Sequence, residues 1–114
     1  MNLKHIYKII DNEELKKVKS SGSYFGSLKD LEDGFIHFSA QDQVENTLKK
    51  YYHDKKNLIL LKVETLKLDH LVWEQASDGN FFPHLYSPLD LINVVEEFKI
   101  TLNSDGSQKL PNIF

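Results

Sequence analysis

Residues 57–64 (NLILLKVE) contain the longest apolar run in the chain, and this stretch decides the fold. Apolar side chains fill five of its eight positions, and only Lys62 interrupts them before Glu64. A nearly continuous run of this length is typical of a strand that is covered on both faces. We therefore predict a central β-strand here.

The chain before this strand begins with a strand and a helix. Residues 5–10 (HIYKII) are rich in β-branched and aromatic residues, which favours a strand. Asp11, with Glu14 three residues later, forms a capping-box signature that starts a helix over 12–20. Gly22 is expected to end that helix.

A second strand and a second helix follow. Residues 24–28 are broken by glycine and are predicted as a loop or a short strand, and an Asp-Gly turn follows at 33–34. Residues 35–39 (FIHFS) are predicted as a strand, and 41–52 as a helix with an apolar stripe at helical spacing. Alternation along the strand places Phe35, His37 and Ser39 on one face, and Ile36 and Phe38 on the other.

Strand-forming segments dominate the chain after the central strand. Residues 71–74 (LVWE) are predicted as a strand. The two prolines at 83 and 88 indicate that 81–86 is a shaped loop or an edge segment. Residues 91–101 are predicted as a long strand with Ile92, Val94 and Phe98 among its core candidates, followed by an Asp-Gly turn and a short tail.

This order of elements, with helices mainly in the N-terminal half, predicts an α+β fold rather than a regular α/β repeat. The length of 114 residues predicts a single domain over 1–114. No stretch is long and apolar enough to cross a membrane or to act as a leader, so we expect a cytoplasmic protein with no membrane partner.

Composition excludes several classes of site. The chain has no cysteine, which excludes a disulfide scaffold, a cysteine nucleophile and thiolate metal sites. Its net charge of −3 argues against a nucleic-acid partner. All fourteen basic residues are lysines, so an anion site would lack the bidentate arginine clamp.

Two histidines and a tyrosine are the leading candidates for chemistry. His37 lies in an otherwise apolar strand, and His84 lies between Pro83 and Leu85 with Tyr86 two residues on. A buried imidazole needs partners for both nitrogens, so each histidine either braces a loop or lines a cleft as an acid–base group. The five histidines lie singly, so no metal site is predicted.

Trp73 and Glu74 extend this set. On one strand they would offer a stacking ring and a carboxylate on opposite faces, or else a core tryptophan beside a solvated glutamate. The usual strong catalytic and nucleotide-binding motifs are absent from the sequence.

The ordered set of segments resembles the bacterial domain-of-unknown-function family 952 over about residues 3–95. The two most specific segments are 33–39 (DGFIHFS) and 82–86 (FPHLY). The other segments that carry the resemblance are Ile6-Tyr7-Lys8-Ile9, Gly26-Ser27-Leu28, Gln43-Val44 and Trp73-Glu74. The family has no established activity, and its fold is similar to that of ADP-ribosyltransferases, in which a split, bent β structure grips NAD.

That resemblance implies roles for the candidate residues. His37, His84 and Tyr86 would be catalytic, whereas Ser39 would bond the ribose or amide of NAD, and Lys8 and Trp73 would also help to bind it. Lys8 stands where the ADP-ribosyltransferase pattern has a histidine, and no glutamate stands clearly at the catalytic position. No cofactor is required on this interpretation, because NAD would be the substrate or ligand.

Three hypotheses follow for a cleft built from 33–39 and 82–86. The first is a transferase acting on NAD or a related nucleotide. The second is a binding module that has the pocket without catalysis, which the missing arginine and glutamate favour over the first. The third is a structural or interaction domain whose histidines brace loops. We expect a small-molecule or nucleotide ligand and a monomer or weak homodimer.

Overall fold

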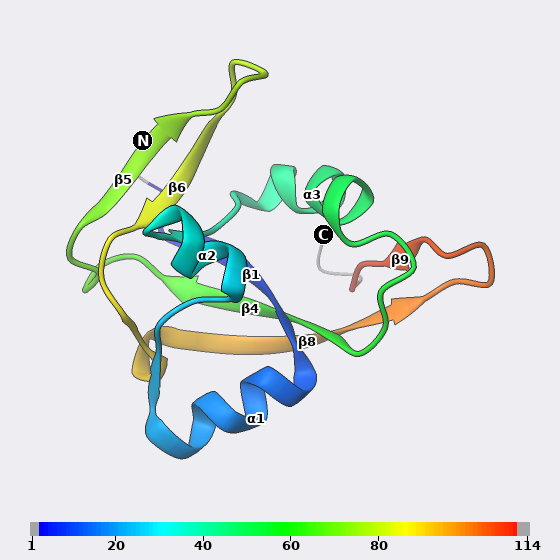
Figure 1. Ribbon diagram of the computed structural model, residues 1–114, viewed down its shortest axis with the longest axis horizontal. Coiled ribbons are helices and arrows are strands. Elements are labelled where there is room, and N and C mark those ends of the chain that lie inside the picture. The colour runs from blue at the N-terminus through cyan, green and yellow to red at the C-terminus, as the bar shows by residue number, and fades with distance from the viewer. Residues whose placement is uncertain (1–2, 112–114) are drawn as a thin grey trace.

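The computed structural model describes residues 3–111 (Figure 1). Its elements are β1 (His5–Asp11), α1 (Asn12–Ser21), β2 (Ser23–Tyr24), α2 (Leu28–Asp33), β3 (Ile36–His37), the 3-10 helix η1 (Gln41–Gln43), α3 (Val44–Tyr51), β4 (Leu58–Glu64), β5 (Leu71–Gln75), β6 (Phe81–Leu85), β7 (Leu89–Asp90), the 3-10 helix η2 (Leu91–Asn93), β8 (Val94–Leu102) and β9 (Gln108–Lys109).

The main sheet has the order β1-β4-β8-β9, with antiparallel neighbours. Strand β4 pairs with β1 along its whole length and with β8 on its other edge, so the predicted central strand is confirmed. Leu60, Leu61 and Val63 of β4 have no exposed surface. Burying such side chains contributes about 1.5–3 kcal/mol each, which explains why this run organises the sheet.

Both faces of the main sheet are covered, as the nearly continuous apolar run of β4 requires. One face carries Leu61 and Val63 and packs against α1 through Leu15. The opposite face carries Leu58 and Leu60 and packs against α3. Figure 1 shows α1 and α3 on opposite sides of the sheet.

A second sheet of three short strands, in the order β3-β6-β5, positions the candidate site. Its β5–β6 hairpin projects from the body of the molecule (Figure 1). Strand β6 lies in the middle, so the prediction of an edge segment over 81–86 is wrong. The carbonyl of Pro83 accepts a hydrogen bond from the Phe38 N–H (3.0 Å), and β3 ends at His37. The proline therefore lies where the ladder stops, and its missing N–H costs little.

The N-terminal helices agree with the sequence except at two places. Helix α1 begins after Asp11, whose carboxylate accepts from two backbone N–H groups, and ends at Gly22 with φ 82°. The predicted helix over 41–52 is divided into η1 and α3. Helix α2 was missed: Ser27 begins it with a capping box.

The C-terminal segment differs more from expectation. Residues 91–93 form η2 rather than the start of a strand, and Ile92 is exposed instead of buried. A 3-10 turn breaks the two-residue alternation from which its burial was inferred. Val94 and Phe98 do pack against the core, and the predicted tail contributes strand β9 to the sheet.

The chain is an α+β protein built on a curled antiparallel sheet, as predicted. The more specific split β structure of ADP-ribosyltransferases stays a prediction. Across residues 3–111, no helix has the length and apolar character needed to cross a membrane.

Candidate functional site

Antiparallel pairing of β3 with β6 places His37 directly opposite His84. Side chains in such a pair leave the same face of a sheet about 4.5–5.5 Å apart. The two imidazole rings meet edge to face, with centroids 5.4 Å apart. Both side chains reach the surface, with exposed fractions of 35% for His37 and 15% for His84. With Phe35, Glu74 and Tyr86, they form what we call the histidine face.

His37 is held between two carboxylates of α2. Its Nδ1 lies 2.5 Å from Asp30 Oδ1, and its Nε2 lies 3.0 Å from Asp33 Oδ2. The α2 cap fixes Asp30, because the Asp30 N–H donates to the Ser27 hydroxyl while the Ser27 N–H donates to Asp30 Oδ2. The two carboxylates therefore lie against the two nitrogens of the ring and together fix its orientation.

Asp30 also pairs with Lys8 of β1, inside the protein. The Lys8 ammonium lies 2.8 Å from Asp30 Oδ2, and both side chains are buried. Burial alone would raise the pKa of Asp30, but hydrogen bonds from His37 and the charge of Lys8 outweigh it and hold the pKa well below its usual range. Burial lowers the pKa of Lys8, and Asp30 opposes that effect.

A glycine makes room for this buried pair. A Cβ at Gly26, whose φ is 116°, would lie 2.6 Å from the Asp30 Cβ. Only glycine fits such an approach and adopts such a backbone conformation without strain. The chain from Gly26 to Asp30 is therefore shaped to carry a carboxylate inward beneath His37.

His84 has a carboxylate partner of its own on the neighbouring strand β5. Its Nδ1 lies 2.8 Å from Glu74 Oε1, and the Tyr86 hydroxyl donates to the same oxygen at 2.5 Å. The hydrogen bonds from Tyr86 and then from His84 lower the pKa of Glu74, and the bond to Glu74 raises that of Tyr86. No residue in 3–111 makes a hydrogen bond to His84 Nε2.

Aromatic rings complete the histidine face. The Phe35 ring stacks on the His84 ring with centroids 4.1 Å apart and an interplanar angle of 22°. Phe35 also contacts Tyr86, with ring centroids 5.2 Å apart. The face therefore combines apolar area with two carboxylate-anchored imidazoles.

The structure brings three of the six predicted site residues together: His37, His84 and Tyr86. Lys8 lies behind Asp30. Ser39 is buried, with its hydroxyl 3.3 Å from that of Thr47. Trp73 points away from Glu74 and packs against the core, which matches the core interpretation of that strand.

Sequence reasoning missed Asp30 as a member of this site, whereas Asp33 and Phe35 lie in the segment 33–39 from which the cleft was predicted but had no role assigned. One signal was present for Asp30: it stands three residues after Ser27, at the spacing of a capping box. Glu74 was considered only as one half of the Trp73-Glu74 pair, and its role as a carboxylate partner for His84 was not foreseen.

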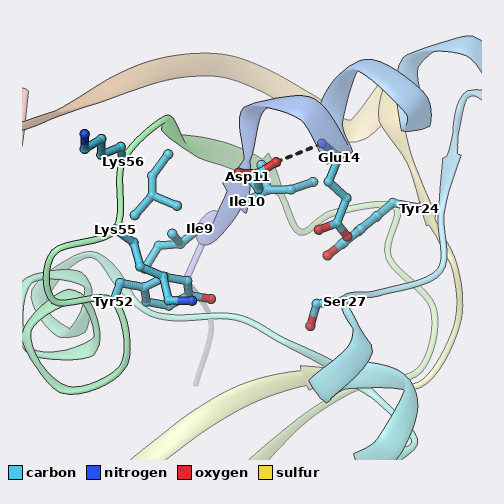
Figure 2. A pocket seen from close by; sticks show the side chains of 10 residues that line it. Ile9, Ile10, Asp11, Glu14, Tyr24, Ser27, Tyr52, Lys55 and Lys56 are labelled. Atoms are coloured by element: carbon cyan, nitrogen blue, oxygen red, sulfur yellow. Dashed lines mark hydrogen bonds between the residues drawn. The ribbon is translucent and has the colours of Figure 1, made fainter.

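Two cavities lie elsewhere in the molecule. One, of about 170 Å³, is lined mainly by residues of β1, α1, β2 and the segment after α3 (Figure 2). The other, of about 320 Å³, lies beside Asn93 and His70. Neither is lined by His37 or His84. Within residues 3–111 no group of three histidine or carboxylate side chains is arranged to hold a metal ion.

Residues 9–97 match the model of the family described as "Protein of unknown function (DUF952)". The chain belongs to this family. The match confirms the resemblance that the segments DGFIHFS and FPHLY carried, and His37, His84 and Tyr86 lie inside it. None of the curated proteins matches this chain.

The chain is also similar to solved structures. The crystal structure of protein CC0527 from Caulobacter crescentus superposes with a TM-score of 0.88 at 42% identity, covering 92% of this chain and 93% of that one. The solution NMR structure of CC0527 gives a TM-score of 0.86 at 40% identity and covers 98% and 97% of the two chains. Both were structural genomics targets.

The histidine face of this DUF952 protein has the parts of an acid–base site. A carboxylate at Nδ1 fixes the ring orientation and leaves Nε2 to exchange a proton. That description fits His84, whose Nε2 makes no hydrogen bond within residues 3–111. His37 differs, because Asp33 occupies its Nε2.

Proposed function

We propose that the histidine face binds a small nucleotide such as NAD and that His84 acts there as the acid–base group. The observation that carries the proposal is the approach of two partly exposed imidazoles, with ring centroids 5.4 Å apart and a carboxylate at each Nδ1. A structural histidine needs partners for its nitrogens but has no need of a second histidine beside it.

Glu74 fixes the chemistry available to His84. With Glu74 ionised, His84 Nδ1 carries the proton, and Nε2 presents a lone pair toward solvent. Nε2 can therefore take a proton from a hydroxyl group of a bound molecule or from water, and Glu74 stabilises the imidazolium that forms.

The aromatic members of the face suit a planar ligand. Tyr86 is largely exposed, and Phe35 supports the His84 ring from one side. A nicotinamide or nucleobase ring stacked on such a surface gains about 1–3 kcal/mol. Under this proposal Lys8 is a positioning residue that acts through Asp30. Ser39 and Trp73 take no direct part.

A transferase reaction would use the same groups. The bond between nicotinamide and C1′ of the ribose breaks with its electron pair leaving on nicotinamide, and the Glu74 carboxylate stabilises the positive charge that develops on the ribose. Water or an acceptor hydroxyl then bonds to C1′ through its oxygen, and His84 Nε2 takes the proton.

A specific contact favours the second candidate function, a binding module without catalysis. Asp33 Oδ2 lies 3.0 Å from His37 Nε2, so an anionic ligand that used this nitrogen would first have to displace a carboxylate. No arginine is present to compensate for that negative charge.

Calorimetric titration with NAD, together with an assay for released nicotinamide, separates these functions. Binding with release supports the transferase, and binding without release supports the module. The variant His84→Ala should bind at least about tenfold more weakly, whereas His53→Ala, at an exposed histidine after α3, should bind normally.

The same variants test the bracing role. If His84→Ala lowers the melting temperature in proportion to its loss of binding, the histidine is structural. If the wild-type protein does not bind NAD at all, the nucleotide proposal is overturned.

A further inference from the structure

The cavity of about 170 Å³ shares no residue with the histidine face. Its walls come from several parts of the chain, and Figure 2 shows side chains converging on it from β1, α1, β2 and the segments after β2 and after α3. An engineered apolar cavity of about 150 Å³ holds benzene. By comparison with that cavity, this one has room for a ligand of about six to eight non-hydrogen atoms.

A buried hydroxyl lies on the wall of this cavity, beside a carboxylate. Tyr24 is only 2% exposed, and its hydroxyl makes no close hydrogen bond. Burial raises the pKa of Tyr24, and the charges of Glu14 and Asp30 together with the contact with Glu14 raise it further. The hydroxyl therefore stays neutral and able to donate.

Glu14 supplies charge beside that hydroxyl. Figure 2 shows its carboxylate next to the Tyr24 oxygen on the cavity wall. Glu14 is half-buried, and no lysine or histidine of residues 3–111 forms an ion pair with it. A cationic group in the cavity would pair with Glu14, whereas an anionic group there would be repelled.

The two ends of the cavity differ in charge. Lys55 and Lys56 belong to its lining but are exposed, so their ammonium groups can meet the outer end of a ligand. The Tyr24 and Tyr52 rings flank the interior, and aromatic faces attract ammonium groups.

We propose that this cavity binds a small zwitterion of amino-acid size. Its ammonium group pairs with Glu14 and contacts the Tyr24 hydroxyl, and its acidic end faces Lys55 and Lys56. The site is independent of the histidine face and of any function proposed there.

Three matched probes test the charges one at a time: 4-aminobutyrate, n-butylamine and n-butyrate. Two-dimensional amide NMR spectra of the whole chain, recorded during titration, give both the affinity and the place of binding. We expect shifts at Tyr24 and Ser27, with 4-aminobutyrate binding more tightly than butylamine and butyrate failing to bind.

Two neighbouring variants provide the control. Glu14→Gln should weaken 4-aminobutyrate binding about tenfold or more, because a charge-assisted hydrogen bond is lost. Glu13→Gln changes an exposed carboxylate on the same turn of α1 and should bind as the wild type does. Near-ultraviolet circular dichroism checks that both variants are folded.

The proposal is overturned if none of the probes binds or if butyrate binds as well as butylamine. It is overturned too if Glu13→Gln and Glu14→Gln have the same affinity for 4-aminobutyrate. It is also overturned if the shifted amides lie on the histidine face. Those outcomes leave the NAD titration unaffected, since it concerns other residues.

Discussion

His37 and His84 are cross-strand neighbours with the same kind of partner, yet they lie in different surroundings. Each places Nδ1 against a carboxylate, but the exposed fraction is 2% for the Asp30 side chain and 39% for that of Glu74. Asp30 is also paired with a buried lysine, whereas Glu74 is paired with the exposed Tyr86.

This difference separates the part of the face that stabilises the fold from the part that is available to a ligand. A buried carboxylate cannot lose its partners without a large cost, so the Lys8–Asp30–His37 group fixes the structure beneath the face. An exposed carboxylate loses little when its contacts change, because water replaces them. The His84 side is thus the part of the face that can respond to a ligand.

The largest expected effect follows from removing the charge of Asp30. Asp30→Asn leaves Lys8 buried without a counter-ion and should lower the free energy of unfolding by about 3–5 kcal/mol. Urea unfolding measures this loss. The matched variant Asp33→Asn, at the exposed carboxylate that contacts the other nitrogen of His37, should lose no more than about 1 kcal/mol. Equal losses would mean that the two carboxylates do not differ as described.

The free energy of unfolding at acid pH should depend on the same carboxylate, Asp30. The pKa of Asp30 is lower in the folded state than in the unfolded chain, where it is near 3.9, so its ionised form stabilises the fold above that pH. That contribution is lost as the pH falls below about 4. The titratable groups that face Asp30 are Lys8 and His37, with Asp33 on the far side of the His37 ring.

Urea midpoints measured between about pH 5 and pH 2 test this dependence. The decline should be steep in the wild type and shallower in Asp30→Asn, whereas Asp33→Asn should retain the steep decline. If Asp30→Asn loses stability with falling pH as steeply as the wild type does, the acid sensitivity does not come from Asp30.

Glu74 should show a smaller effect, confined to its neighbours. The variant Glu74→Gln removes the carboxylate whose hydrogen bond and charge raise the pKa of Tyr86, so the Tyr86 phenol should titrate closer to its ordinary value near 10. Ring-carbon NMR signals followed through alkaline pH report that titration. Glu96→Gln, at an exposed carboxylate on β8, is the control and should leave Tyr86 unchanged. An unaltered Tyr86 in Glu74→Gln would show that the two groups do not bond in solution.

Local patterns predicted much of the fold and part of the site. The apolar run of β4 predicted a strand covered on both faces, and the two-residue alternation placed Phe35 and His37 on a face opposite Ile36 and Phe38. The opposition of His37 and His84 was not predictable, because it depends on pairing between segments 47 residues apart in the sequence. Only tertiary structure fixes that register.

The buried pair was missed although the strand contained a signal for it. In the sequence HIYKII, Lys8 alternates with Ile6 and Ile10, and these isoleucines lie in one core cluster while Ile9 lies in the other. A lysine in the row of buried isoleucines must be buried too, and it needs a carboxylate. Which carboxylate reaches it depends on the approach of Gly26, which no local pattern describes.

The smallest expected effect separates the two nitrogens of His37. Asp33→Ala removes the outer carboxylate and should change the free energy of unfolding by no more than about 1 kcal/mol, because Asp33 makes surface contacts. Nitrogen NMR should show a shift of the His37 Nε2 signal, while the Nδ1 signal stays in place because Asp30 still accepts from it. The His53 ring signals serve as the internal control. A change at Nδ1 of similar size would mean that Asp33 helps to hold the buried group, and the division between a fixed inner carboxylate and a replaceable outer one would then be wrong.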